Sequence, residues 1–415
     1  MTRMRRWFLA AAALVLLAAL FVYWGTRPQR VAALAMSQLG SALGLEITAT
    51  GTSEYQLRNG VRLVLRDVVA REPGAATPLL RAGRIDVAVP WSTLRSRGKD
   101  LAITRVELDA PVIDARALQH WLAARPASEG EQRMPTLSNG LRVRDGRVVG
   151  NGWSVDAIAL DVPRVLPDRS VDVRVSGHAV VSTARMPFSL TLALGKPAND
   201  AMLHGQGTLG YEQATRRLAS HLWLSGPLHF GAGEVRVAPL RFSTHARYTE
   251  GDTNLPFAFA LNGPLRVQGA TIALSPAGIA LRGSDLVPDV DARAAFAYSK
   301  QAALHLDGTI ATWPDTWPAL PPPIGQSTSP LPFVLDYQGP FDLSDTTHLR
   351  VTRDATRFDG RFRLPEVLAW IDTTPASPLP PLTGTIKTPR VDVAGAVLEG
   401  VEVRMDDPAL GDAAP

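Results

Sequence analysis

The sequence predicts a mainly β protein, with an elongated and mostly antiparallel repeat sheet that has a long apolar face and follows one N-terminal transmembrane helix. Three observations predict this fold class. Glycine (34) and proline (33) are abundant among the 415 residues, which suits many turns between short strands and disfavours long helices. Apolar and polar residues alternate with a period of two from residue 45 onward, and a Pro-Phe phrase recurs three times.

The first element is an uncharged apolar run, WFLAAAALVLLAALFVYW, which extends from Trp7 to Trp24. Its length is sufficient to span a bilayer, and the arginines within residues 1–6 predict that this short tip is cytoplasmic. We therefore expect a membrane anchor at 7–24, with Trp7 and Trp24 at its two interfaces. The rest of the chain then faces the periplasm, which makes the protein a single-pass protein of the cell inner membrane.

A cleaved signal peptide is the alternative for this N-terminus, because Ala33-Leu34-Ala35 offers a small-x-small cleavage site. The apolar run is longer than a usual signal peptide core, and Arg27 and Arg30 lie between that run and the site. Both interpretations export the bulk of the chain.

Residues 25–44 favour a short juxtamembrane helix that ends at Gly44. We then expect an N-terminal β segment at 45–125 and a repeated β-groove segment at 136–407, separated by a polar stretch that follows a short helix at 115–124. Proline-rich stretches at 312–332 and 373–382 are predicted loops, and 408–415 is a predicted flexible tail. The expected strands before the repeats are Leu45 to Thr50, Val61 to Ala70, Arg84 to Val89, Leu101 to Leu108, Leu141 to Val149, Ala157 to Val162 and Val171 to Ser176.

The repeated phrase reads MPFSLTLALG at 186–195, LPFAFALNGPL at 255–265 and LPFVLDYQGPF at 331–341. In each copy the alternation begins at the phenylalanine, which predicts one apolar strand face in a common phase. That face could contact lipid, or it could be the core of a closed sandwich or barrel, because alternation does not say what covers a face. The phenylalanines could equally pack one repeat on the next. The lipid-facing candidates are Phe188, Leu190, Leu192, Phe257, Phe259, Leu261, Phe333, Leu335 and Tyr337.

Composition and motifs argue against several other classes of protein. The net charge of +4 comes from 43 basic and 39 acidic residues that are interspersed, so we expect no nucleic-acid partner. The chain has no cysteine, and no serine lies in a nucleophile elbow. The Gly205 to Gly210 stretch fits a dinucleotide fingerprint, but the residues after it, Tyr211 to Leu224, favour a hairpin. His221 could meet His229 or His204 across strands, yet nothing supplies a third ligand. We expect no catalytic residue, no metal and no cofactor.

The segment from Leu57 to Ile113 contains a recognisable order of weak motifs: Leu65 and Val68, Leu79 to Ala82, Ile85-Asp86-Val87, Trp91 to Leu94, Ile103, Val106 to Leu108 and Pro111-Val112-Ile113. It resembles the N-terminal part of the AsmA family of inner-membrane-anchored periplasmic proteins. The closing stretch LTGTIKTPRVDVAGAVLEGVEVRMDD at 382–407 is similar to that family's C-terminal strand pair, and the Pro-Phe repeats between them are also similar. Together these segments cover most of residues 1–407.

This resemblance implies a relative of AsmA and TamB proteins, in which the elongated repeat sheet forms a curved apolar groove. The groove would bind or conduct phospholipid or another acyl lipid and contribute to outer-membrane biogenesis. It also implies contact with the inner membrane and with outer-membrane assembly proteins. The alternative of a different class is a periplasmic scaffold or regulator of outer-membrane protein assembly that carries no lipid. A third possibility, a periplasmic enzyme, has no residues in this sequence to carry it.

Overall fold

We describe a computed structural model of the chain, which places residues 40, 44–51, 54–56, 60–92, 102–124, 136–166, 168–196, 200–231, 234–317, 319–320, 324–340, 343–372, 380–393 and 396–410. The predicted anchor at 7–24, almost all of the juxtamembrane helix and most of the tail lie outside these residues. No helix within them is long and apolar enough to cross a bilayer. Strands make up 69% of the described residues and pair mostly antiparallel, which confirms the mainly β prediction.

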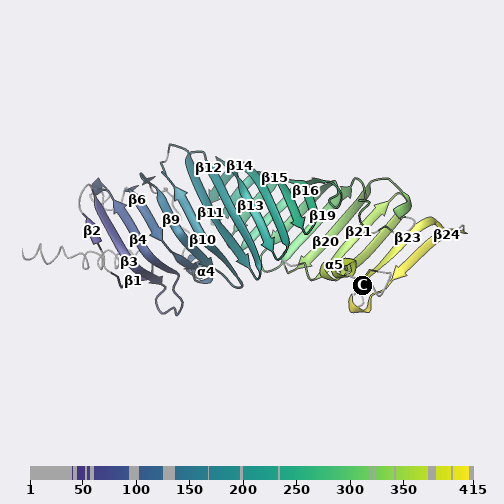
Figure 1. The fold of residues 1–415 in the computed structure, drawn as a ribbon, viewed down its shortest axis with the longest axis horizontal. Helices are drawn as coiled ribbons and strands as arrows, with labels where there is room; N and C mark the ends of the chain where they lie inside the picture. Colours follow the sequence, from purple (N-terminus) through teal and green to yellow (C-terminus); the bar gives the residue numbers. More distant parts are fainter. Residues whose placement is uncertain are drawn as a thin grey trace, which may run out of the picture. The chain divides into compact units, whose positions relative to one another are not determined.

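The chain divides into two compact units, Met1–Pro197 and Ala198–Pro415. Within the first unit, strands are present at the predicted positions and a helix at the predicted 115–124 (Figure 1). Three strands are four or five residues longer than predicted, and the predicted strand at 101–108 is divided into two strands, 102–103 and 105–109, that belong to different sheets. The elements of this unit are β1 (Glu46–Ala49), β2 (Glu54–Gln56), β3 (Val61–Arg71), β4 (Leu80–Val89), β5 (Ala102–Ile103), β6 (Arg105–Asp109), β7 (Val112–Asp114), α4 (Ala115–Ala123), β8 (Thr136–Leu137), β9 (Leu141–Val149), β10 (Trp153–Val162), β11 (Val171–Val181) and β12 (Ala184–Leu194).

The sheet of the first unit is antiparallel except around the helix. β9 runs parallel to both β6 and β7, because the chain crosses over between β7 and β9 through α4 and the 125–135 stretch. Within the first unit, strands that precede that stretch therefore pair with a strand that follows it. Asp114 caps the start of the helix, because its side chain accepts hydrogen bonds from the backbone N–H groups of Arg116 and Ala117 at 3.0 and 2.9 Å.

The second unit is a meander in which every strand from β14 to β24 pairs antiparallel with its predecessor in sequence (Figure 1). Its elements are β13 (Ala201–Gln213), β14 (Arg216–Gly231), β15 (Glu234–Glu250), β16 (Thr253–Gln268), β17 (Thr271–Gly283), β18 (Val290–Tyr298), β19 (Ala302–Ile310), η1 (Ile324–Gln326), β20 (Leu331–Gly339), β21 (Thr346–Arg353), β22 (Thr356–Arg363), α5 (Leu364–Asp372), β23 (Leu382–Val393), β24 (Ala396–Met405) and η2 (Pro408–Leu410).

In the second unit, the predicted hairpin is present and one helix occurs that was not predicted. The stretch that fits a dinucleotide fingerprint lies inside β13, and β13 and β14 form the predicted hairpin. The helix α5, between β22 and β23, was not predicted. Its first turn contains Pro365, which is tolerated there because the N–H that it lacks has no partner within the helix.

In the sheet of the second unit, the pairing register shifts at two positions where a proline lies within a strand. The pairing of β15 shifts beside Pro239, and the pairing of β17 shifts beside Pro276. Proline has no N–H to donate to the ladder, so a strand accommodates it at a bulge. Apolar residues continue on the same face beyond each shift, because Leu265 is opposite both Val237 and Leu274.

Candidate functional site

The three Pro-Phe phrases are the strands β12, β16 and β20, and in each one the candidate residues lie on a single face of their sheet. Register decides this, because residues directly opposite one another on paired strands point to the same face. In the first unit, Leu190 is the last member of an apolar row of directly opposed residues. This first apolar row consists of Leu65, Ile85, Leu108, Val143, Leu160, Val175 and Leu190.

A longer row crosses the second unit and includes Leu261 and Phe333. From β14 to β24, each strand places an apolar residue or glycine directly opposite the one before it. This second apolar row consists of Leu224, Phe242, Leu261, Ile279, Ala292, Gly308, Phe333, Val351, Phe358, Ile386 and Val403.

The remaining candidates lie on the same face beside these rows. Phe259 is opposite Thr244 and Leu281, and Leu335 is opposite Leu306 and Leu349. Phe188, Leu192, Phe257 and Tyr337 take the same phase on their strands. All nine candidates therefore belong to the apolar face of their own unit.

The residues adjacent to the second apolar row on each strand point to the other face of the sheet, where they form a mostly polar row. It starts at Ser225 and Arg241 on β14 and β15 and ends at Thr385 and Arg404 on β23 and β24. Between them it contains Asn262, Gly278, Arg293, Asp307, Val334, Arg350 and Asp359. The sheet of the second unit thus has one apolar and one polar face.

Side chains of the second apolar row are mostly half-buried. Phe242, Leu261, Ile279, Phe333 and Val351 all retain partial exposure, and Val403 is 45% exposed. A row that formed the centre of a closed core would be almost fully buried on every strand. Fully buried side chains instead form small clusters, such as Leu274, Ala277 and Ala294. The apolar face is therefore incompletely covered by the described part of the chain.

Each phenylalanine that follows a repeat proline lies directly opposite a glycine: Phe188 opposite Gly177, Phe257 opposite Gly283 and Phe333 opposite Gly308. A Cβ atom on Gly177 or Gly308 would come within 3.2 or 2.9 Å of the ring of its phenylalanine. The rings of Phe188 and Phe333 therefore pack over bare backbone, whereas a Cβ atom on Gly283 would first meet Val287. Phe259 and Leu335, two residues further along their strands, have no glycine opposite them on either neighbouring strand.

The second half of the predicted proline-rich loop packs against one end of the apolar face. Arg353, at the end of β21, is only 5% exposed, and register places it on the apolar face. Its guanidinium donates hydrogen bonds to the backbone carbonyls of Ser329 (2.9 Å) and Ile324 (3.0 Å). Ile324 itself is 4% exposed. Residues 324–330, which we call the strap, therefore cover the face beside the turn between β21 and β22.

The first half of the same loop is held elsewhere. Trp317 donates its indole N–H to the carbonyl of Leu286 at 2.9 Å, and its ring lies edge-on to Trp313 with centroids 4.7 Å apart. These contacts fix the loop on the connection between β17 and β18. The sequence predicted a loop here, but nothing in its pattern indicated which segment the loop would contact.

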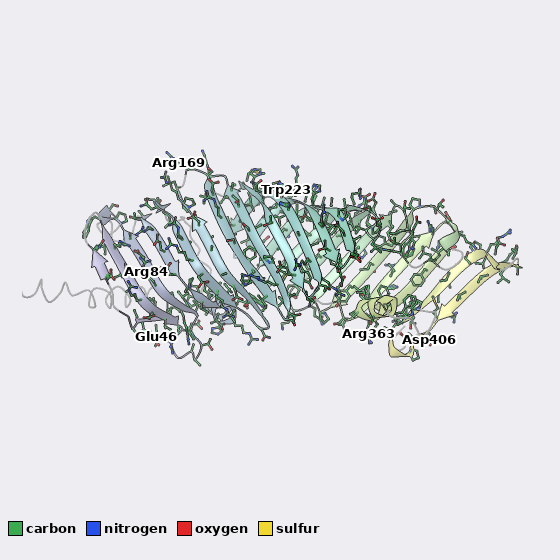
Figure 2. The ribbon with its side chains drawn as sticks, viewed as in Figure 1. Glu46, Arg84, Arg169, Trp223, Arg363 and Asp406 are labelled. Carbon is green, nitrogen blue, oxygen red and sulfur yellow. The ribbon has the colours of Figure 1, made fainter. Side chains whose placement is uncertain are left out.

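The polar face of the first unit carries a dense charge network. Asp86 on β4 is fully buried, and its carboxylate accepts hydrogen bonds from Arg62 (Nη2 to Oδ2, 2.6 Å) and Arg84 (Nη2 to Oδ2, 2.8 Å), whose position Figure 2 shows. Arg105 lies 3.6 Å away. Burial acts to raise the pKa of Asp86, but the hydrogen bond and charge of Arg62 and the charges of Arg105 and Arg84 outweigh it and lower that pKa.

The network continues across the strands, and its charges alternate from Glu107 onward. Glu107 is directly opposite Asp86, and Arg142 and Asp161 follow it in register. Arg174 ends the series with an ion pair of 3.3 Å to Asp161. A small cleft beside the network is lined by Glu54, Gln56, Arg62, Val64, Arg66 and Arg84. Each of these arginines has a carboxylate partner, so the network neutralises itself and offers no free charge to a ligand.

Histidine geometry differs from one prediction. His221 and His229 lie on the same strand, β14, so they do not face each other across strands. His221 is directly opposite His245 on β15, and His204 is opposite Ser225. Within the described residues there is no group of three histidine or acidic side chains that could hold a metal ion.

Comparison with known proteins gives no match of any kind: no family model fits the chain, and neither a curated protein nor a solved structure is detectably similar to it.

Proposed function

We propose that the chain is an inner-membrane-anchored periplasmic protein, related to the AsmA family, that binds or conducts phospholipid along its apolar faces and contributes to outer-membrane biogenesis. The observation that carries this proposal is the second apolar row. An uninterrupted series of apolar residues and glycines on successive strands, half-buried and backed by a polar row, is an arrangement that suits hydrocarbon chains. In this proposal the sheet curves around the row, which then lines a groove.

The energetics of such a face favour an acyl ligand. Covering apolar surface that is otherwise wet contributes roughly 25 cal/mol per Å². With strands about 4.8 Å apart, the row from β14 to β24 extends for about 48 Å along the sheet. An acyl chain spans about half of a hydrocarbon core that is ~30 Å thick, so the row exceeds the length of one chain about threefold. It offers either several binding positions or a path between them.

The polar row on the opposite face of the sheet explains why lipid would bind only the apolar face. Arg241, Arg350 and Arg404 point to the side opposite the apolar row and remain solvated. The free-energy cost of removing a charged group from water is far larger than the gain from its contact with hydrocarbon. A lipid headgroup, for the same reason, would stay at the rim of the apolar face in contact with water.

Site-specific photocrosslinking in cells tests the proposal. A photoreactive residue at 190, 259 or 335 replaces a side chain of the apolar face, and one at 191, 258 or 334 replaces its out-of-phase neighbour. We expect adducts that contain phosphate at the first set and none at the second. Protein adducts at the first set would instead support the scaffold alternative. The lipid proposal would be abandoned if neither set gave a phosphate-containing adduct.

A further inference from the structure

On the polar face, β14 and β15 carry a cluster of exposed basic and aromatic side chains that is not part of the apolar rows. Trp223, labelled in Figure 2, is 44% exposed among charged and polar neighbours. Its ring lies edge-on to His245 with centroids 5.7 Å apart. Arg241 and Arg247 are exposed on the same strand as His245, and His221 is opposite it. We call the five residues His221, Trp223, Arg241, His245 and Arg247 the basic patch.

The two arginines of the basic patch have no ion-pair partner within the described residues, and their neighbours in register are uncharged. Arg241 is flanked by Ser225 and Asn262. Arg247 is flanked by Ala219 and Pro256. Carboxylates are absent from these positions although cross-strand pairs of opposite charge are what a solvated sheet face commonly uses.

Some other arginines on the polar faces of this protein do have carboxylate partners. Arg350 lies 3.1 Å from Asp336, and Arg404 lies 3.0 Å from Glu402. In the first unit, Arg174 lies 3.3 Å from Asp161. The basic patch is therefore a region of uncompensated positive charge around an exposed aromatic ring, which is the composition that binding surfaces favour.

We propose that the basic patch binds an extended acidic segment of a partner protein. The segment lies along β14 and β15, packs an apolar side chain against Trp223 and places carboxylates against Arg241 and Arg247. These two arginines are six positions apart on one strand, so their separation is about 20 Å. That distance suits two acidic groups of one extended peptide and is too large for a single phosphate or headgroup to bridge.

Guanidinium groups favour this partner because each can bind a carboxylate with two parallel hydrogen bonds. The arrangement along the strands, with charge at both ends and an aromatic ring between them, favours a linear segment over a flat anionic surface. The proposal concerns the polar face only and does not depend on lipid binding by the apolar face.

The test measures fluorescence anisotropy of a labelled peptide mixed with the full-length protein in neutral detergent. The peptide, about eight residues long when extended, has a pair of glutamates at each end and a phenylalanine between them. We expect binding that weakens as salt is added, since screening acts on exposed charges. The R241Q/R247Q variant is expected to lose at least about tenfold in affinity, and W223A somewhat less.

Two controls separate specific from general attraction. The R174Q/R404Q variant removes the same net charge from arginines that have carboxylate partners, and it is expected to bind like the unaltered protein. A peptide with the same composition and its glutamates contiguous is expected to bind less tightly. Equal loss in both double variants, or equal binding of both peptides, would overturn the proposal. Binding to phosphatidylglycerol vesicles without binding to the peptide would assign the patch to a membrane surface instead.

Discussion

Phe333 and Gly308 lie directly opposite each other on β20 and β19, and a Cβ atom added to Gly308 would stand 2.9 Å from the phenylalanine ring. The same atom would also stand 2.7 Å from the Cβ of Ala292 and 2.8 Å from the carbonyl oxygen of Asp291. The ring, the glycine and the neighbouring backbone therefore fit together without room for a methyl group. Phe188 and Gly177 have the same relationship in the first unit.

The substitution Gly308→Ala is expected to lower the free energy of unfolding by about 1–3 kcal/mol, because one strand must shift to admit the added carbon. Urea unfolding followed by far-ultraviolet circular dichroism measures the change. Gly278→Ala is the matched control in the same sheet, since its added Cβ would meet nothing closer than 3.9 Å. Similar losses in both variants would show that the effect is a general one of glycine replacement.

Asp86→Asn is expected to destabilise the protein by about 1–3 kcal/mol, since three partly exposed arginines lose the buried carboxylate that they share. Asp161→Asn is the control, because its carboxylate is 31% exposed and its ion pairs contribute about 1 kcal/mol or less. Equilibrium unfolding by urea distinguishes the two. A loss at Asp86 no larger than that at Asp161 would contradict a structural role for the buried carboxylate.

Acid should act on the same carboxylate. The pKa of Asp86 is lowered in the folded protein, because the arginine interactions outweigh the opposing effect of burial. Its contribution to stability is therefore fully present above the unfolded pKa of about 3.9 and is lost as pH falls through the lower folded value. We expect the stability difference between the unaltered protein and Asp86→Asn to narrow as pH falls below about 4. A difference that stayed constant through that range would contradict this linkage.

Arg353→Met is expected to release the strap, because the carbonyls of Ile324 and Ser329 lose their donor while a side chain of similar length keeps the apolar contacts. Hydrogen exchange monitored by mass spectrometry should show faster exchange within 324–330. Arg357→Met, at an exposed position on the other face of β22, should leave this exchange unchanged. Unchanged exchange in both variants would mean that the strap is held by its apolar contacts alone.

Leu261→Asp is expected to reduce the phospholipid that copurifies with the protein, because a carboxylate in the middle of the second apolar row excludes hydrocarbon there. Asn262→Asp places the same charge on the adjacent polar row and should leave the lipid content unchanged. A phosphate assay on extracted lipid gives the ratio, and circular dichroism confirms that both variants keep their strands. Equal lipid content in the two folded variants would count against the proposed function.

Much of this fold follows from local pattern. The alternation in VDVRV at 171–175 and in the three Pro-Phe phrases identifies strands and their apolar faces, and both are found where expected. What alternation cannot give is which residue lies opposite which, because register depends on turns and on the bulges at Pro239 and Pro276. The apolar rows were therefore visible only after the strands were paired.

The missed features have the same origin. His221 and His229 appeared able to face each other, but both belong to the long strand β14, whose length the sequence did not indicate. The burial of Arg353 depends on a loop that returns to cover it, and no local signal marks such a contact. Helix α5 is short and lies between strands, where the period of a few apolar residues does not separate helix from strand.

Each strand from β14 to β24 pairs with its neighbours in sequence, so the length of the second apolar row would change in steps of one hairpin. A hairpin removed from the middle of this meander would leave two strands that could still pair, and the row would shorten by about 10 Å without losing its apolar character. A hairpin inserted there would lengthen it by the same amount. Reach along the sheet is thus set by the number of hairpins in the gene product, and evolution can alter it without redesigning any single contact.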